Sequence, residues 1–479
     1  MRLRYLMLAA LFVLIGAGWT QAQEQYFAVF MDGQKIGHAI HTRQVDGTKV
    51  TTVEAIDLTI SRGEISMHVS QKQTSIETTD GKPLGFEMVS ELGPTQQVLK
   101  GTVDPNGRVR VKEGATTQVT EWPQGAVMSE GLRLLQMATG LKAGSVVDTM
   151  IFSPETMTAL KATSKIGAKE KVDLLGRVVT LTKVVTQMET PGGDFIATDY
   201  VDDKLISQKT VMPIMGMNLE LMACDKIFAL SKNDVVDFLD KATIQSPVSL
   251  VGEEKATAIR YTLKPINQAK LQFPVTDNQS VQVGEDGAVI LMARPINAVK
   301  GGEMPYKGGD KAAIEALKPS RYVQSDANEI VALSKKAVGN AKDATEAAKR
   351  IESFVRKYIT DKNLSVGYAS ALEVVQSKEG DCTEHAVLTA ALCRAAGIPA
   401  QVVFGVLYID EYAGKKDVFF GHAWTQAYID GKWVQLDATR HAIGPTRIAM
   451  AVGSGDPDEF FGMISTFGNF KIVSAKVEN

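Results

Sequence analysis

Cysteine is scarce in this sequence, which contains only Cys224, Cys382 and Cys393 among 479 residues. Exported proteins that depend on disulfides carry more cysteines, usually in even number. The count therefore excludes a disulfide-built scaffold. In an oxidising compartment an odd number also leaves at least one thiol free, so each cysteine must be placed individually.

An excess of charge of one sign is also missing, since the formal net charge is -3. We therefore expect no nucleic-acid partner and no binding to anionic membranes. Beyond the N-terminus no apolar run is long enough to span a membrane, and no internal repeat occurs. At about 100–200 residues per domain, the length predicts two or three domains.

The N-terminus has the pattern of a secretory signal peptide. Arg2 and Arg4 precede an apolar stretch over residues 5–18, and Thr20 and Ala22 supply the small residues of a cleavage site. We expect residues 1–22 to be removed, and the exported protein to be periplasmic or secreted without a membrane span. An uncleaved anchor is the alternative, but the stretch is shorter than the roughly 20 residues of a spanning helix.

Residues 23–245 predict a large β-rich domain, and residues 246–300 a small β-rich subdomain. Turn pairs such as Asp46-Gly47 and Asn106-Gly107 separate runs rich in β-branched residues, which indicates antiparallel hairpins. One helix is expected over residues 130–141. The residues indicate no specific function beyond a module that binds or positions something. A lipid- or polymer-binding role is an alternative, and a lipid carrier would require a wide apolar cavity.

The character of the chain changes after a linker predicted over residues 301–320, where glycine and proline are dense. Residues 321–479 predict a second domain with helices as well as strands. Asp343 and Glu346 form a capping-box-like helix start before apolar residues at helical spacing. The fold class is therefore α+β.

Cys382 is predicted at the first position of a helix. Asp381 and Glu384 can form a capping box around it, and Gly397 ends the helix. Unpaired N–H groups and the positive end of the helix dipole favour a thiolate there. Cys393 follows 393 − 382 = 11 residues later in mid-helix, too far for a disulfide, and is expected in the core.

His422 and Asp437 are predicted to meet across a hairpin. Asp430-Gly431 indicates a two-residue turn. Counting outward from it puts Trp424 opposite Asp437, with His422 as the diagonal neighbour at roughly 7 Å. A carboxylate could thus orient an imidazole base for the thiol of Cys382.

Two other interpretations of these residues stay open. His422 and Asp437 could be a structural pair, and Cys382, His385, His422, Asp437 and His441 could ligate a metal ion. No C-x-x-C or H-E-x-x-H motif supports a metal site, so no metal and no cofactor is expected.

Residues 368–440 resemble the core of the transglutaminase-like superfamily. The motifs that carry the resemblance are Glu379-Gly380-Asp381-Cys382, Glu384-His385-Ala386, Gly421-His422-Ala423-Trp424 and Leu436-Asp437-Ala438-Thr439. The resemblance implies a papain-like fold, with a helix that carries the nucleophile packed on an antiparallel sheet. It also implies triad roles for Cys382, His422 and Asp437. The part of the chain before residue 300 lies outside it.

These observations predict an exported thiol enzyme that acts on amide bonds of an envelope protein or peptide through a thioester on Cys382. Water as acceptor gives hydrolysis, which we favour because water is abundant outside the cell, and an amine gives cross-linking. The Cys382 N–H could stabilise the oxyanion, together with Gln376, whose spacing to the cysteine resembles that in papain-like proteases. Trp424 and Trp433 could wall the site or belong to the core. A non-catalytic peptide-binding scaffold is the alternative, and the sequence predicts no oligomeric state.

Overall fold

The chain forms two compact units, Met1–Phe238 and Leu239–Asn479, in a computed structural model. The structure describes residues 23–478 except 63–64, 93–94, 114–115, 141, 155–156, 191–192, 215–216, 235–242, 267–270, 297–298, 363–368, 413, 441–442 and 457–465. The expected signal peptide lies outside these residues. Within them, no helix combines the length and the apolar character that a membrane span requires.

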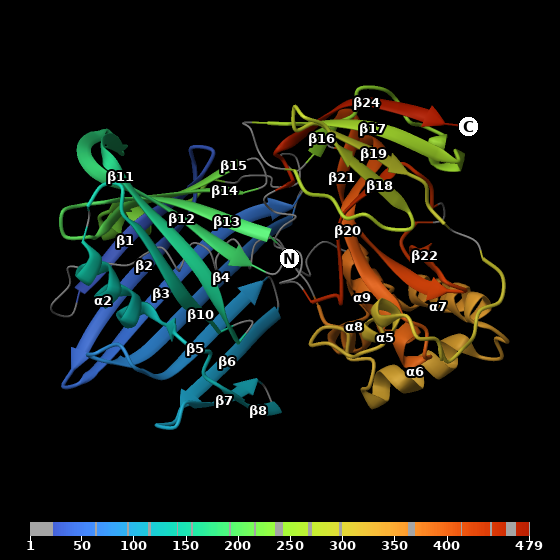
Figure 1. The fold of residues 1–479 in the computed structure, drawn as a ribbon, viewed down its shortest axis with the longest axis horizontal. Coiled ribbons are helices and arrows are strands. Elements are labelled where there is room, and N and C mark those ends of the chain that lie inside the picture. The colour runs from blue at the N-terminus through green and yellow to red at the C-terminus, as the bar shows by residue number, and fades with distance from the viewer. Residues whose placement is uncertain are drawn as a thin grey trace. The chain divides into compact units, whose positions relative to one another are not determined.

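Unit 1 is built on one 15-stranded sheet, with strand order β8 to β1 followed by β15 to β9 (Figure 1). Most neighbouring strands form antiparallel hairpins, as the turn pairs predict, whereas β9 and β10 are parallel and joined through a helix. β1 pairs with β15 so that Tyr26 lies opposite Cys224. The strands are β1 (Gln23–Met31), β2 (Gln34–Asp46), β3 (Lys49–Arg62), β4 (Ile65–Thr78), β5 (Pro83–Leu92), β6 (Thr95–Val103), β7 (Arg108–Glu113), β8 (Thr116–Glu121), β9 (Ala126–Val127), β10 (Val146–Ser153), β11 (Thr158–Leu174), β12 (Arg177–Thr190), β13 (Gly193–Val201), β14 (Ser207–Ile214) and β15 (Met217–Cys224).

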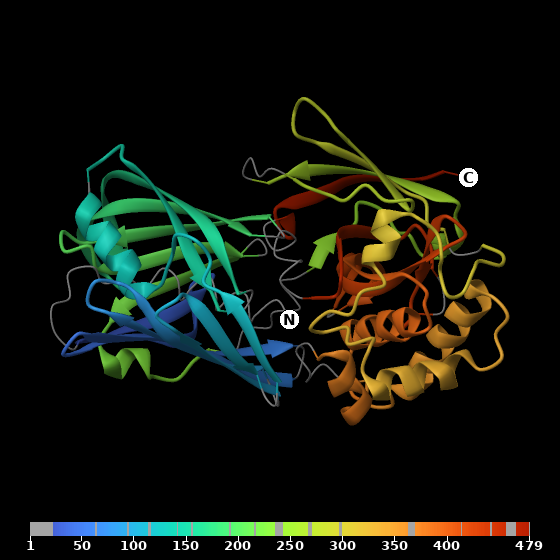
Figure 2. The ribbon, with the colours of Figure 1, turned by 60° about the horizontal axis from the view of Figure 1, so that its bottom comes forward.

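The sheet curves so that its two halves form layers, with helix α2 (Ser129–Thr139) at one end (Figure 2). The expected helix over residues 130–141 is thereby confirmed. Glu77 of β4 accepts the N–H groups of Glu130 at 2.7 Å and Gly131 at 3.0 Å, which fixes the start of α2 to one half of the sheet. Arg43 binds Glu130 through its guanidinium at 2.8 Å. A short helix, α3 (Lys226–Ala229), follows β15.

Unit 2 contains two antiparallel sheets. The first has the order β16-β21-β20-β23, with β22 paired to β21, and the second has the order β18-β19-β17-β24. The last strand of the chain thus pairs with a strand more than 200 positions earlier, since Ala258 lies opposite Glu478. The strands are β16 (Thr243–Gln245), β17 (Ala258–Pro265), β18 (Gln279–Val283), β19 (Val289–Ala293), β20 (Ala400–Tyr412), β21 (Lys415–Ile429), β22 (Lys432–Leu436), β23 (Arg447–Gly453) and β24 (Phe470–Glu478).

Helix α9 (Cys382–Ala395) is the central helix of unit 2 and packs on β20 and β21. All its residues from Thr383 to Arg394 are buried, including the polar side chains of Glu384, His385 and Arg394. Cys393 is fully buried, which confirms its expected core position. The other helices are η1 (Glu253–Lys255), α5 (Lys311–Glu315), α6 (Asn328–Val338), α7 (Ala344–Tyr358) and α8 (Ala371–Ser377). A helix packed on an antiparallel sheet is the arrangement that the sequence predicted, and the α+β class is confirmed.

Residues 301–320, expected as a linker, are ordered against unit 2. The N–H of Ala344 donates to the Gly302 carbonyl at 3.0 Å, and that of Tyr306 donates to the Gly397 carbonyl at 2.9 Å. Residues 246–300, expected as a subdomain, contribute β17, β18 and β19 to the sheet that β24 completes. The compact division of the chain lies at Phe238/Leu239.

Candidate active site

Cys382 is the first residue of α9. Asp381 is the N-cap, and its Oδ1 accepts the N–H of Thr383 at 2.9 Å, while Glu384 Oε2 accepts the N–H of Asp381 at 2.9 Å. The predicted capping box is therefore present. Cys382 itself is partly exposed. Its position combines access to solvent with the electrostatic effect of a helix start.

Glu384 anchors this helix start in the core. Its side chain is fully buried and accepts hydrogen bonds from Ala369 N at 2.9 Å and Thr383 Oγ1 at 2.8 Å, besides that from Asp381 N. Burial, followed by the charge of Asp381, raises the pKa of Glu384 to about 8. The hydrogen bonds fix the residues that surround Cys382 relative to the segment before α8.

The hairpin of β21 and β22 has the predicted register. Asp430 and Gly431 both have positive φ, at 51° and 76°, and Ile429 lies opposite Lys432. Continued along the hairpin, this register brings His422 Nε2 to 2.9 Å from Asp437 Oδ2. Because a carboxylate can only accept, Nε2 carries the hydrogen, and Nδ1 is the ring atom left to act as a base.

Asp437 is held in the ionised form by several donors. Oδ2 also lies 3.1 Å from a guanidinium nitrogen of Arg447, and Oδ1 accepts from Thr439 N at 2.9 Å, Thr439 Oγ1 at 2.6 Å and Arg440 N at 3.1 Å. Burial alone would raise the pKa of Asp437, but His422 and Arg447 outweigh it and hold this pKa well below its usual range. The carboxylate is therefore a fixed negative charge beside the imidazole.

Helix α7 clamps the backbone around Asp437. Glu352 accepts the N–H of Asp437 at 2.8 Å. One turn later, Arg356 donates to the carbonyl oxygens of Asp437 at 2.8 Å, Ala438 at 3.2 Å and Arg440 at 2.9 Å. These contacts tie the end of β22 to a rigid helix, so the carboxylate has little freedom to move away from His422.

The start of α9 and the His422–Asp437 pair lie in the same region of unit 2. Thr425, three residues after His422, donates its hydroxyl to the carbonyl of Ala386 in α9 at 2.9 Å. His385 is close enough to Asp437 for that charge to raise its pKa, although burial lowers this pKa overall. Sulfur, imidazole and carboxylate are thus carried by the first turn of one helix and by the hairpin on which it packs.

Residues 331–438 match the family model of the transglutaminase-like superfamily, whose members are typically cysteine enzymes. The match includes Cys382, His422 and Asp437. The chain carries a transglutaminase-like core.

Three solved structures are similar to parts of the chain. A candidate cysteine protease from Cytophaga hutchinsonii is 19% identical over 46% of this chain and 86% of its own, with a TM-score of 0.31. A β-barrel-like protein of unknown function from Brucella abortus is 14% identical over 43% of this chain and 96% of its own, with a TM-score of 0.34. The periplasmic domain of TgpA from Pseudomonas aeruginosa is 15% identical over 41% of this chain and 74% of its own, with a TM-score of 0.28. No curated protein matches the chain.

Trp424 packs directly behind the histidine of the transglutaminase-like core. It is 1% exposed, its ring centroid lies 6.1 Å from that of His422 at an angle of 22°, and the Arg447 guanidinium lies 5.2 Å from its ring. Gly405 lies opposite His422, and a Cβ there would overlap the Ile448 carbonyl oxygen and come within 2.9 Å of the Trp424 ring. Glycine is therefore required for the tryptophan to support His422.

Two other sequence candidates lie apart from this pair. Trp433 pairs with Tyr428 near the turn of the hairpin, at a centroid distance of 5.1 Å, and lies four residues before Asp437. Gln376 is exposed on α8, and its side chain has no hydrogen bond to any residue that the structure describes. Within the described residues, no hydrogen bond or ring contact joins either side chain to His422 or Asp437.

His385 is a feature of the transglutaminase-like core that the sequence suggested only as a metal ligand. Its Nδ1 lies 2.6 Å from the carbonyl oxygen of Asp381, so Nδ1 carries the hydrogen, and Nε2 is buried without a hydrogen-bond partner in the described part of the chain. No group of three possible metal ligands occurs among the described residues, and His441 lies outside them. The i, i+3 spacing to Cys382 was the available signal that His385 lies near the thiol.

Proposed function

We propose that this protein is an exported enzyme that breaks amide bonds through a thioester on Cys382. The observation that supports this proposal most is that one core contains two features together. One is a cysteine at a capped helix start, and the other is a buried histidine 2.9 Å from a carboxylate whose backbone is fixed. All three residues fall inside the family match. The signal-peptide pattern of residues 1–22 supports export to the periplasm or beyond.

The proposed reaction begins with proton transfer from the Cys382 sulfur to His422. Nδ1 receives this proton, because Nε2 already donates to Asp437. The thiolate attacks the amide carbonyl carbon, and Asp437 stabilises the imidazolium that forms. The C–N bond then breaks as Nδ1 returns the proton to the departing nitrogen. The acyl group stays on sulfur as a thioester, and an amine is released.

The oxyanion of the tetrahedral intermediate requires donors. The Cys382 N–H is the first candidate because it opens a helix. Gln376 is a hypothesis for the second donor, and from its exposed place on α8 it would have to turn toward the substrate. Trp424 packs against the imidazole of His422. Of the two tryptophans that the sequence suggested for the wall of the site, we therefore propose this role for Trp424 alone.

Water is the acceptor that we favour for the thioester, which gives hydrolysis of a peptide, isopeptide or side-chain amide bond. Transfer to an amine, which would cross-link proteins, is the alternative reaction of the same intermediate. A non-catalytic scaffold is disfavoured because Arg447 holds Asp437 ionised beside His422, while α7 fixes the backbone of Asp437 in place. A peptide-binding scaffold has no need for that electrostatic arrangement.

The test is capture of the thioester. Purified protein is incubated with envelope extract and quenched with acid, and the acyl group on each cysteine is identified by mass spectrometry. We expect acylation of Cys382 in the wild type and in the control variant Cys224→Ala, and none at other cysteines in Cys382→Ala. A fluorescent primary amine added before quenching distinguishes the two acceptors, because only cross-linking chemistry attaches it to protein. Acylation that persists in Cys382→Ala contradicts the proposed nucleophile.

A further inference from the structure

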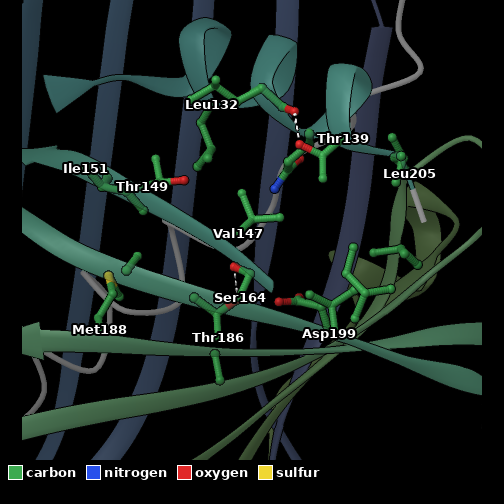
Figure 3. A pocket seen from close by; sticks show the side chains of 18 residues that line it. Leu132, Thr139, Val147, Thr149, Ile151, Ser164, Thr186, Met188, Asp199 and Leu205 are labelled. Atoms are coloured by element: carbon green, nitrogen blue, oxygen red, sulfur yellow. Dashed lines mark hydrogen bonds between the residues drawn. The ribbon is translucent and has the colours of Figure 1, made fainter. Parts of the chain in front are cut away.

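Unit 1 contains a pocket between α2 and the half of the sheet formed by β10 to β13 (Figure 3). It has a cavity volume of about 80 Å³ and is lined by 18 residues, most of them apolar. Leu135 and Thr139, near the end of α2, are exposed, whereas Ala162 and Ala197 on the strands are buried. The pocket therefore runs from solvent beside the helix toward the inner face of the sheet.

Most polar groups that line the pocket are already paired within the protein. Ser164 and Thr186 share a hydrogen bond of 2.8 Å across β11 and β12. Thr139 donates its hydroxyl to the Leu135 carbonyl at 2.9 Å. These pairs leave little capacity to bind a polar ligand, so the one charged side chain decides what the pocket prefers.

Asp199 is that side chain, and it is the only titratable residue among those that line the pocket from α2 and from β10 to β13. Its side chain reaches toward Thr186 and Ser164 in Figure 3, and the residue is 6% exposed. Thr210 and Ser207 donate to Oδ1 at 2.7 and 3.3 Å. Across the described residues, Oδ2 has no hydrogen-bond partner.

No basic side chain compensates this carboxylate inside the pocket, since the lining residues include no lysine, arginine or histidine. Burial raises the pKa of Asp199 to about 7, although the two hydroxyl groups oppose the shift. A buried carboxylate without a cation is costly, and an opposite charge from outside would relieve the cost.

We propose that this pocket binds a small primary alkylamine, with the alkyl chain against the apolar wall and the ammonium group on Asp199 Oδ2. The chemistry matches on both sides, because an ammonium has donors but no acceptor and the free oxygen can only accept. The volume favours a short chain. With about 80 Å³ of space, this pocket is much smaller than the wide cavity that a lipid carrier requires.

Binding is tested by calorimetry on the purified full-length protein with three probes of the same chain length: hexylamine, hexanol and hexanoate. Hexylamine should bind most tightly at pH 8. In the variant Asp199→Asn its affinity should fall by about ten- to a hundredfold, the usual effect of losing a hydrogen bond to a charged partner. Hexanol should bind alike to both proteins. The matched control is Asp194→Asn, which changes an exposed aspartate of the same strand and should alter neither affinity.

The wild-type protein provides a second test that needs no variant. Hexylamine stays protonated at pH 6 and pH 8, whereas a carboxyl group with a pKa of about 7 is mostly neutral at the lower value. The wild-type protein should therefore bind hexylamine about tenfold more weakly at pH 6 than at pH 8.

Three results would each overturn the proposal. Equal hexylamine affinity in wild type and Asp199→Asn would show that the pocket binds only the chain. Hexanoate that binds more tightly than hexylamine, and more tightly at pH 6, would show that the protonated Asp199 serves as a donor. No binding of hexylamine at pH 8 would exclude the site altogether. None of these results depends on the thiol chemistry proposed for unit 2.

Discussion

The substitution Asp437→Asn changes one atom of the candidate site but reverses its hydrogen-bonding pattern. Oδ1 faces the donors of Thr439 and Arg440, whereas Oδ2 faces His422 at 2.9 Å and Arg447 at 3.1 Å. The amide oxygen of the variant should stay with the backbone donors, because these cannot move. The amide NH₂ group then faces His422 and Arg447. There the NH₂ donor points at the N–H donors of both side chains, whereas the carboxylate oxygen accepted hydrogen bonds from them.

The cost to stability follows from Arg447. This residue is 3% exposed, and its charge interaction with Asp437 at 3.1 Å amounts to about 5 kcal/mol at an effective dielectric constant of 20. Removing one member of a buried ion pair typically costs about 3–5 kcal/mol. We therefore expect the unfolding free energy of unit 2 to fall by about 3 kcal/mol. For a unit of this size, that lowers its melting temperature by about 6–12 °C.

The cost to catalysis follows from His422. In the variant the amide NH₂ donates to Nε2, so the ring hydrogen moves to Nδ1, the atom that must receive the thiol proton in the proposed reaction. The wrong tautomer and the loss of the charge that stabilises the imidazolium should lower the rate of thioester formation by about 10³- to 10⁴-fold, as in other triads.

Two further variants separate the catalytic effect from the structural one. Asp437→Asn combined with Arg447→Met removes the unpaired buried cation, so it should recover part of the stability but none of the rate. Asp430→Asn is the control, since asparagine also fits a turn position with φ of 51°. Rates of thioester formation are measured by acid quench and mass spectrometry, and melting by calorimetry. A variant Asp437→Asn that melts early but forms the thioester at the wild-type rate would refute the orienting role.

Three further predictions concern the cysteines, unit 1 and α7. Iodoacetamide at pH 6.5 should alkylate Cys382 well before the others, because burial raises the pKa of Cys393 to about 12 and also raises that of Cys224; equal labelling, read by peptide mass spectrometry, would exclude a stabilised thiolate. The pKa of Asp199 is raised from 3.8 to about 7 in the folded state, so folding favours its proton and stability falls as the pH rises from about 4 to about 7. Asp199→Asn should therefore melt higher than wild type by a margin that grows from pH 4 to pH 8 in calorimetry, and a constant margin would contradict this reasoning. Arg356→Met should slow thioester formation by about tenfold, because the carbonyl oxygens around Asp437 lose the hydrogen bonds from this guanidinium and Asp437 is held less firmly. An unchanged rate would mean that α7 is not needed for alignment.

The parts of the site that the sequence predicts are those encoded by short-range rules. The capping box around Cys382 depends on two residues within a single turn, and the register of the hairpin depends on Asp430 and Gly431 alone. Once that register is known, the contact between His422 and Asp437 follows by counting. Local rules therefore suffice for the cysteine position and for the histidine–carboxylate pair.

The partners that hold Asp437 could not be predicted in this way. Arg447 reaches it from β23, which pairs with β20 and not with the hairpin itself. Glu352 lies on α7, 85 positions before Asp437, and nothing in its local sequence distinguishes it from a solvated helix residue. In the same way, the pairing of β1 with β15, which joins the two halves of the first sheet, links strands almost 200 residues apart. Contacts of this kind depend on how whole elements pack, which no local pattern specifies.

Two buried aspartates show how the surroundings of one side chain decide its chemistry. Asp437 accepts from His422 and from the Arg447 guanidinium as well as from backbone and hydroxyl donors, so it stays ionised and can orient an imidazole throughout the physiological pH range. Asp199 is buried to a similar degree but has only two hydroxyl donors, and both use the same oxygen. Its charge is therefore not compensated within the described part of unit 1, and a proton or an external cation must supply what Arg447 supplies in unit 2. Because a proton and an ammonium group compete for the same oxygen, a bound amine should lower the pKa of Asp199. Hexylamine binding should accordingly release protons near pH 7, and calorimetry in buffers of different ionisation enthalpy would detect that release.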